Sequence, residues 1–128
     1  MSARILVVDD ERQLAYYLRQ TLLLEVRGVA VDTAHSGEEA LSRMAKSGYD
    51  LIIADLRMPG FSGLELIKGV RYLDDDVPII LMTGYGSSRL RQEAARLGAT
   101  SYIDKPFDVG EMLDAVRALL PEREGPDG

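Results

Sequence analysis

The sequence predicts a single α/β domain in which an open, doubly wound sheet of five parallel strands is covered by five helices on both faces. Short apolar runs alternate along the chain with longer helix-like segments. Three of these runs are continuous rather than alternating, which is typical of strands buried on both faces. Because parallel strands are joined by right-handed crossovers, the helices must lie on both sides of the sheet.

Five strands are expected, one at each apolar run. They are residues 5–8, 29–31, 51–54 and 77–82, with a weaker run around Tyr102 and Ile103. The first helix is expected to begin near Glu11, since Leu14, Leu18 and Leu22 follow at helical spacing. The fourth helix is expected at about residues 88–97, with its end marked by Gly98.

Three further helix starts carry the spacing of a capping box. In each case a side-chain oxygen stands three residues before a glutamate that can reach back to the backbone. The pairs are Ser36 with Glu39, Ser62 with Glu65, and Asp108 with Glu111. The second, third and fifth helices should begin at these sites.

Composition limits the classes of function. The chain has 128 residues, 46% of them hydrophobic and 28% charged, with no cysteine and a net charge of −6. This charge argues against nucleic-acid binding by this segment, because such binding depends on Lys and Arg. No apolar stretch suits a membrane helix and no signal peptide stands out, so we expect a cytoplasmic protein. Residues 1–120 should form the domain, and 121–128 a linker or disordered tail.

Polar residues follow four of the five expected strands. Asp9, Asp10 and Glu11 follow the first strand, Asp55 the third, Thr83 the fourth and Lys105 the fifth. Each has an ordinary structural alternative, because acidic residues cap helices, threonine suits turns and lysine suits solvated surfaces. Together they are more informative, since the carboxyl ends of parallel strands meet at one edge of the sheet, where ligands bind.

Three clustered carboxylates require positive charge. Two unit charges about 4 Å apart interact by roughly 4 kcal/mol at an effective dielectric constant near 20, so one lysine does not offset three carboxylates. Oxygen ligands with room for water suit Mg²⁺, and Mn²⁺ can substitute. A carboxylate beside such an ion and a lysine can attack phosphorus, and Asp55 is the central candidate.

Four motifs give the sequence a family resemblance. They are residues 5–11 (ILVVDDE), 55–60 (DLRMPG), 81–84 (LMTG) and 104–107 (DKPF). Over roughly residues 3 to 120 the chain closely resembles the receiver domains of two-component response regulators, of the chemotaxis and nitrogen-regulation type. The resemblance implies a flavodoxin-like fold with strand order 2-1-3-4-5.

The resemblance also assigns roles to residues. It makes Asp55 the phosphorylated residue, with Mg²⁺ bound by Asp55, by Asp10 directly, by Asp9 mainly through water, and by the backbone carbonyl of Arg57. Lys105 and Thr83 would contact the phosphoryl group.

A second set of roles concerns the switch and a peptide bond. Thr83 and Tyr102 would form the switch that carries the signal to the surface. Packing of an aromatic ring at a strand end is the alternative for Tyr102. The peptide bond between Lys105 and Pro106 should be cis, a state that only bonds preceding proline adopt at low cost.

The implied partners are a sensor histidine kinase or a histidine phosphotransfer protein, and a downstream output domain or protein. A homodimer through the fourth helix, fifth strand and fifth helix is a further hypothesis. The domain would be a bacterial signalling switch rather than an enzyme, although it would take part in its own phosphotransfer and autodephosphorylation. Regulation of transcription is one output consistent with the resemblance.

Three other functions fit the sequence less well. A haloacid dehalogenase-like phosphohydrolase would need an aspartate where Arg57 stands, and arginine cannot shuttle protons at neutral pH. A nucleotide- or flavin-binding module would need a phosphate cradle in place of Asp9 and Asp10. An interaction domain that no longer accepts phosphate would typically lack one of the acidic residues or the lysine. His35, expected in a strand-to-helix turn, is interpreted as an ordinary loop residue.

Overall fold

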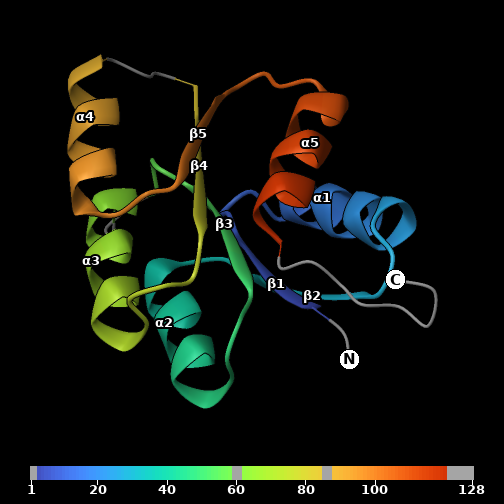
Figure 1. Cartoon of the computed structure of the whole chain (residues 1–128), viewed down its shortest axis with the longest axis horizontal. Helices are drawn as coiled ribbons and strands as arrows, with labels where there is room; N and C mark the ends of the chain where they lie inside the picture. Colours follow the sequence, from blue (N-terminus) through green and yellow to red (C-terminus); the bar gives the residue numbers. More distant parts are fainter. Residues whose placement is uncertain (1–2, 59–61, 85–87, 121–128) are drawn as a thin grey trace.

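The structure is a computed structural model that describes residues 3–58, 62–84 and 88–120. Its five strands are all parallel and lie in the order β2-β1-β3-β4-β5, which confirms the predicted fold (Figure 1). The strands are β1 (Ala3–Val8), β2 (Val29–Ala34), β3 (Leu51–Asp55), β4 (Ile79–Thr83) and β5 (Ser101–Asp104). The expected tail, residues 121–128, lies outside the described residues.

Alternate residues of each strand pack into two separate cores. On one face of β1, Leu6 and Val8 pack with apolar side chains of α2, α3 and α4. On the other face, Ile5 and Val7 pack with those of α1 and α5. Figure 1 shows the same division, with α1 and α5 together on one side of the sheet. The continuous apolar runs in the sequence therefore reflect strands that are buried on both faces.

The five helices are α1 (Arg12–Glu25), α2 (Gly37–Lys46), α3 (Gly63–Leu73), α4 (Ser88–Leu97) and α5 (Val109–Leu119). Gly28 and Gly98 follow α1 and α4 with positive φ angles of 71° and 119°, which glycine adopts readily. None of the helices in the described ranges is long and apolar enough to cross a membrane.

The three predicted capping boxes have different outcomes. Ser62 and Glu65 form a complete capping box at the start of α3. Ser36 accepts from the backbone N–H of Glu39, but the Glu39 carboxylate accepts from His35 instead of Ser36. The fifth helix begins after Asp108 as predicted, but the predicted capping box is absent, because the Asp108 side chain makes no capping hydrogen bond. Asp108 is exposed, so water can satisfy the first N–H groups of α5.

A close backbone approach joins Leu56, the residue after β3, to Gly63 at the start of α3. The N–H of Gly63 donates to the carbonyl of Leu56 at 2.7 Å. A Cβ atom on Gly63 would lie 2.6 Å from the Cα atom of Leu56, so only glycine fits without a shift of the backbone. This contact holds the start of α3 against the end of β3, next to the candidate site.

A polar cluster joins β1, β2 and the segment before β3. The Asp32 carboxylate accepts from the Tyr49 hydroxyl at 2.6 Å and pairs with the Arg4 guanidinium at 2.9 Å. The guanidinium also lies over the Tyr49 ring, 5.0 Å from its centroid. The hydrogen bond from Tyr49, together with Arg4, lowers the pKa of Asp32 despite its partial burial.

We expect Asp32→Asn to reduce the free energy of unfolding at neutral pH by about 1 kcal/mol, a value discounted for partial exposure. A carboxylate with a lowered folded-state pKa stabilises the fold above its unfolded pKa of about 3.9, and this contribution is lost as the pH falls through the folded-state pKa. Urea denaturation from pH 7 down to pH 3 should show the two proteins converging. Asp75→Asn, at an exposed position, is the control. A difference that does not narrow as the pH falls below about 3.9 would contradict this explanation.

Candidate functional site

The carboxyl end of β1 provides two aspartates with different surroundings. Asp9 is fully buried, and its carboxylate accepts the backbone N–H of Glu11 at 2.9 Å. The backbone carbonyl of Asp9 contacts Nδ1 of His35 at 3.1 Å, which ties β1 to the turn after β2. Asp10 is exposed to solvent. His35 lies in the turn between β2 and α2, as expected from the sequence, and its contact with Asp9 is structural.

Asp55 ends β3, the strand next to β1, and is only 7% exposed. One of its carboxylate oxygens, Oδ1, accepts the backbone N–H of Arg57 at 3.0 Å. This hydrogen bond fixes the orientation of the carboxylate. It also draws the backbone at Arg57 back toward the end of the strand.

Lys105 follows β5 and reaches across the end of β4 to the acidic residues. Its Nζ atom lies 3.1 Å from Oδ2 of Asp55, 3.5 Å from Oδ2 of Asp9 and 3.9 Å from Oε1 of Glu11. Its backbone N–H donates to the carbonyl of Thr83 at 2.7 Å. The bond from Lys105 to Pro106 is cis, as the sequence led us to expect.

Burial and charge act against each other in this cluster. Burial raises the pKa of Asp9, and this effect exceeds the lowering by the hydrogen bond from Glu11 and by the charge of Lys105. For Lys105, burial alone would lower the pKa, but the combined attraction of Asp9, Asp55 and Glu11 raises it. The lysine therefore stays charged while one buried carboxylate remains poorly compensated.

Asp9, Asp10 and Asp55 together could hold a metal ion. Each offers a carboxylate oxygen, and these oxygens lie within 4.8 Å of one another. An all-oxygen set with one exposed member fits a hard divalent cation that keeps some of its water. The incomplete compensation of Asp9 by Lys105 is consistent with a need for such a cation.

The two expected switch residues lie on the adjacent strands β4 and β5. Thr83 is fully buried at the end of β4. The Tyr102 hydroxyl is also buried, close enough to Thr83 for the threonine to affect its pKa, but without a hydrogen bond of ordinary geometry. Burial is the main cause that raises the pKa of Tyr102. The structure thus brings these two side chains together on the adjacent strands β4 and β5.

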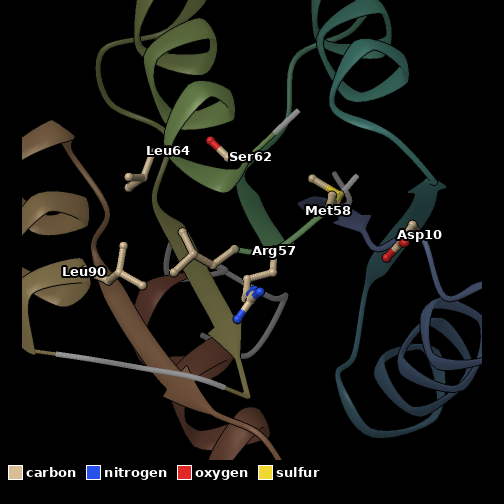
Figure 2. A pocket seen from close by; sticks show the side chains of 7 residues that line it. Asp10, Arg57, Met58, Ser62, Leu64 and Leu90 are labelled. Atoms are coloured by element: carbon tan, nitrogen blue, oxygen red, sulfur yellow. The ribbon is translucent and has the colours of Figure 1, made fainter. Parts of the chain in front are cut away.

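A hollow of about 620 Å³ lies beside the acidic cluster. It is lined by Asp10, Leu56, Arg57, Met58, Ser62, Leu64 and Leu90. Figure 2 shows Arg57 between Asp10 and Met58 on one side and Leu64 and Leu90 on the other. The hollow therefore has a polar end at the candidate metal site and an apolar end between α3 and α4.

One residue that contacts the expected switch residue Tyr102 was not predicted from the sequence. Arg91 of α4 forms an ion pair with Asp104 and lies over the ring of Tyr102, 4.4 Å from its centroid. No pattern in the sequence predicts these contacts, because the spacing of residues along the chain does not show which side of α4 faces β5.

The comparisons with known proteins agree on one family. The model of the response regulator receiver domain matches residues 5–117. The chain is 36% identical over 121 residues to sporulation initiation phosphotransferase F of Bacillus subtilis, covering 94% of this chain and 96% of that protein. It is 41% identical over 120 residues to response regulator MprA of Mycobacterium tuberculosis, but spans only about half (51%) of that relative. Chemotaxis protein CheY4 of Vibrio cholerae superposes with a TM-score of 0.85 at 34% identity, covering 94% of this chain and 100% of CheY4.

We expect Lys105→Met to lower the free energy of unfolding by about 2 kcal/mol near pH 7, because it leaves buried carboxylates without their cation. The raised pKa of Lys105 means that its contribution is complete at neutral pH and is lost only as the pH rises through that value. The loss should shrink toward pH 4, since the uncompensated Asp9 can then bind a proton. Urea denaturation in the presence of a chelator measures both effects. Lys68→Met, on the exposed side of α3, is the control and should change little.

Proposed function

The chain belongs to the response regulator receiver domain family, the signalling domains of two-component systems, and we propose that it accepts a phosphoryl group on Asp55 and changes conformation in response. The observation that carries this proposal is the surroundings of Asp55. Its carboxylate lies 3.1 Å from Nζ of Lys105 and within 4.8 Å of oxygens from Asp9 and Asp10. The proposed nucleophile, the lysine cation and two further proposed metal ligands therefore lie together at one edge of the sheet.

The residues fit Mg²⁺, with Mn²⁺ as a substitute. We propose that Asp10 and Asp55 bind the ion directly, that Asp9 binds it mainly through water, and that the backbone carbonyl of Arg57 completes the protein ligands. When bound, the ion supplies positive charge to phosphoryl oxygens. Asp9 and Asp55 are already held by hydrogen bonds from backbone N–H groups, so their carboxylates need little rearrangement.

In the proposed transfer, a carboxylate oxygen of Asp55 attacks the phosphorus of a phosphohistidine. A P–O bond to Asp55 forms while the P–N bond to the donor imidazole breaks. The electron pair of that bond leaves with the imidazole nitrogen, which is left neutral or takes up a proton. Lys105 stays beside the new phosphoryl oxygens and offsets their charge, and Thr83 donates its hydroxyl hydrogen to one of them.

Phosphorylation would then shift the switch pair. The phosphoryl group carries a charge of roughly −1.5 to −2 and three acceptor oxygens, which is enough to draw the Thr83 hydroxyl toward Asp55. The Tyr102 hydroxyl already lies close to Thr83 and would occupy the space that the threonine leaves. The effect would reach the surface formed by α4, β5 and α5.

The proposal also covers partners and place of action. The donor would be a sensor histidine kinase or a histidine phosphotransfer protein, in the cytoplasm of a bacterium. Autodephosphorylation would reset the domain. The receiver part, residues 1–120, would act on an output domain or separate protein, with regulation of transcription as one output. Homodimerisation would use α4, β5 and α5.

Intact-mass measurement after incubation with acetyl phosphate or phosphoramidate tests the proposal. With Mg²⁺ present, the native protein should gain one phosphoryl group that hydroxylamine removes. Asp55→Asn should gain none, because the amide is a poor nucleophile at this site. If neither these donors nor a panel of phosphorylated histidine kinases produces an adduct, the chain is an interaction domain that does not accept phosphate.

Asp10→Asn should separate metal binding from folding. The variant should bind Mg²⁺ at least tenfold more weakly, since it loses one charged ligand. Without metal it should melt at the same temperature or higher, because the change relieves repulsion among three clustered carboxylates. Calorimetric titration with Mg²⁺ and thermal melts in a chelator measure the two effects. A lower melting temperature in the chelator would contradict the charge argument.

A further inference from the structure

Arg91 makes two contacts with β5 from the neighbouring helix α4. Its guanidinium lies over the face of the Tyr102 ring, 4.4 Å from the centroid, and forms an ion pair with the Asp104 carboxylate. Tyr102 and Asp104 are two residues apart on one strand, so they project from the same face of the sheet. The side chain between them, Ile103, is buried in the opposite core. Arg91 therefore spans both side chains at once.

The position of the Tyr102 ring needs such support. Its hydroxyl is buried, and among the described residues it has no hydrogen-bond partner of ordinary geometry. A buried hydroxyl without a partner favours a ring position in which water can reach it. A guanidinium over the ring face opposes this tendency through cation–π attraction, and the ion pair with Asp104 fixes the guanidinium in place.

We propose that Arg91 is a positioning residue that holds Tyr102 inward against Thr83. The contacts leave the phosphorylation chemistry untouched, because Arg91 contacts neither Asp55 nor Lys105 among the contacts of the described residues. They act on the balance between inward and outward positions of the ring. A side chain that favours one of two states shifts their populations, and it changes the affinity of any ligand that prefers that state.

A second arginine on α4 serves as a matched control. Arg96 pairs with Glu93 of the same helix and is more exposed than Arg91. Arg96→Gln thus removes the same charge from the same helix without altering a contact to β5. Arg91→Lys is the conservative variant, since lysine keeps the charge but lacks the planar group that stacks on an aromatic ring.

The first experiment measures ring position without phosphate or metal. Protein with ¹³C-labelled tyrosine rings is studied by NMR, with the Tyr102 signal identified by its loss in Tyr102→Leu. In the native protein the Tyr102 ring should show a nuclear Overhauser effect to the Thr83 methyl group and protection from a soluble gadolinium chelate. Arg91→Gln should weaken the Overhauser effect to Thr83 and increase the relaxation of the ring signal by the chelate. Arg91→Lys should give intermediate values of both. Arg96→Gln should resemble the native protein. An unchanged ring in Arg91→Gln overturns the proposal.

The second experiment measures the consequence for the switch, and this part rests on the proposed function. The probe is beryllofluoride with Mg²⁺, which mimics a phosphoryl group on Asp55. Arg91→Gln should weaken its binding about fivefold, the size expected for loss of a partly exposed cation–π contact. In a Tyr102→Leu background the same substitution should change binding by less than about 1.5-fold, because there is no ring to position. Equal weakening in both backgrounds means that Arg91 acts through charge alone and overturns the proposal.

The two experiments distinguish failure of the proposed phospho-acceptor function from failure of the positioning role of Arg91. If native protein fails to bind beryllofluoride while Arg91→Gln still releases the ring, the phospho-acceptor function is wrong and the positioning role of Arg91 stands. If native protein binds beryllofluoride and the ring does not move in Arg91→Gln, the function stands and the role of Arg91 is wrong.

Discussion

The burial of two aspartates around a single lysine is the interaction on which the rest of the site depends. Asp9 and Asp55 come from neighbouring strands, whereas Lys105 comes from the edge strand β5 and crosses the end of β4 to reach them. The parallel direction of the strands puts all three residues at one edge of the sheet, and the strand order places β1 beside β3 and β4 between β3 and β5. Two buried carboxylates and one ammonium group leave excess negative charge. Burial raises the pKa of Asp9 by more than Lys105 and the hydrogen bond from Glu11 lower it. The same excess suits the site to a divalent cation.

Rigid surroundings keep this cluster in place. Two apolar cores enclose the sheet from both sides, so the strand ends cannot move independently. Backbone N–H groups hold the carboxylates of Asp9 and Asp55, and the close approach of Gly63 to Leu56 joins the start of α3 to the end of β3. The hollow on the α3 and α4 side leaves one approach to the polar end of the site open. Such prearranged groups need little rearrangement at the moment of reaction.

The proposed switch pair contains a buried hydroxyl group that lacks a hydrogen-bond partner of ordinary geometry. Thr83 and Tyr102 lie together, yet the tyrosine hydroxyl lacks a good partner, and Arg91 contacts its ring from α4. Small free-energy differences between two ring positions would suit the proposed switch, because a phosphoryl group on Asp55 would then be enough to reverse their order. A buried polar group without a good partner is a place where such bistability is expected.

The sequence by itself determined the α/β class, the approximate strands and helices, and the residues at each strand end, because these follow from local patterns of burial, capping and chain direction. Ser36 and Ser62 cap their helices as expected. The exposed Asp108 makes no capping hydrogen bond, since water can replace a side-chain cap. Only the tertiary structure decided how Lys105 divides its contacts among three carboxylates, and which arginine of α4 reaches Tyr102. Those contacts join elements that are distant along the chain. They depend on how each helix is rotated against the sheet, which a one-dimensional pattern does not specify.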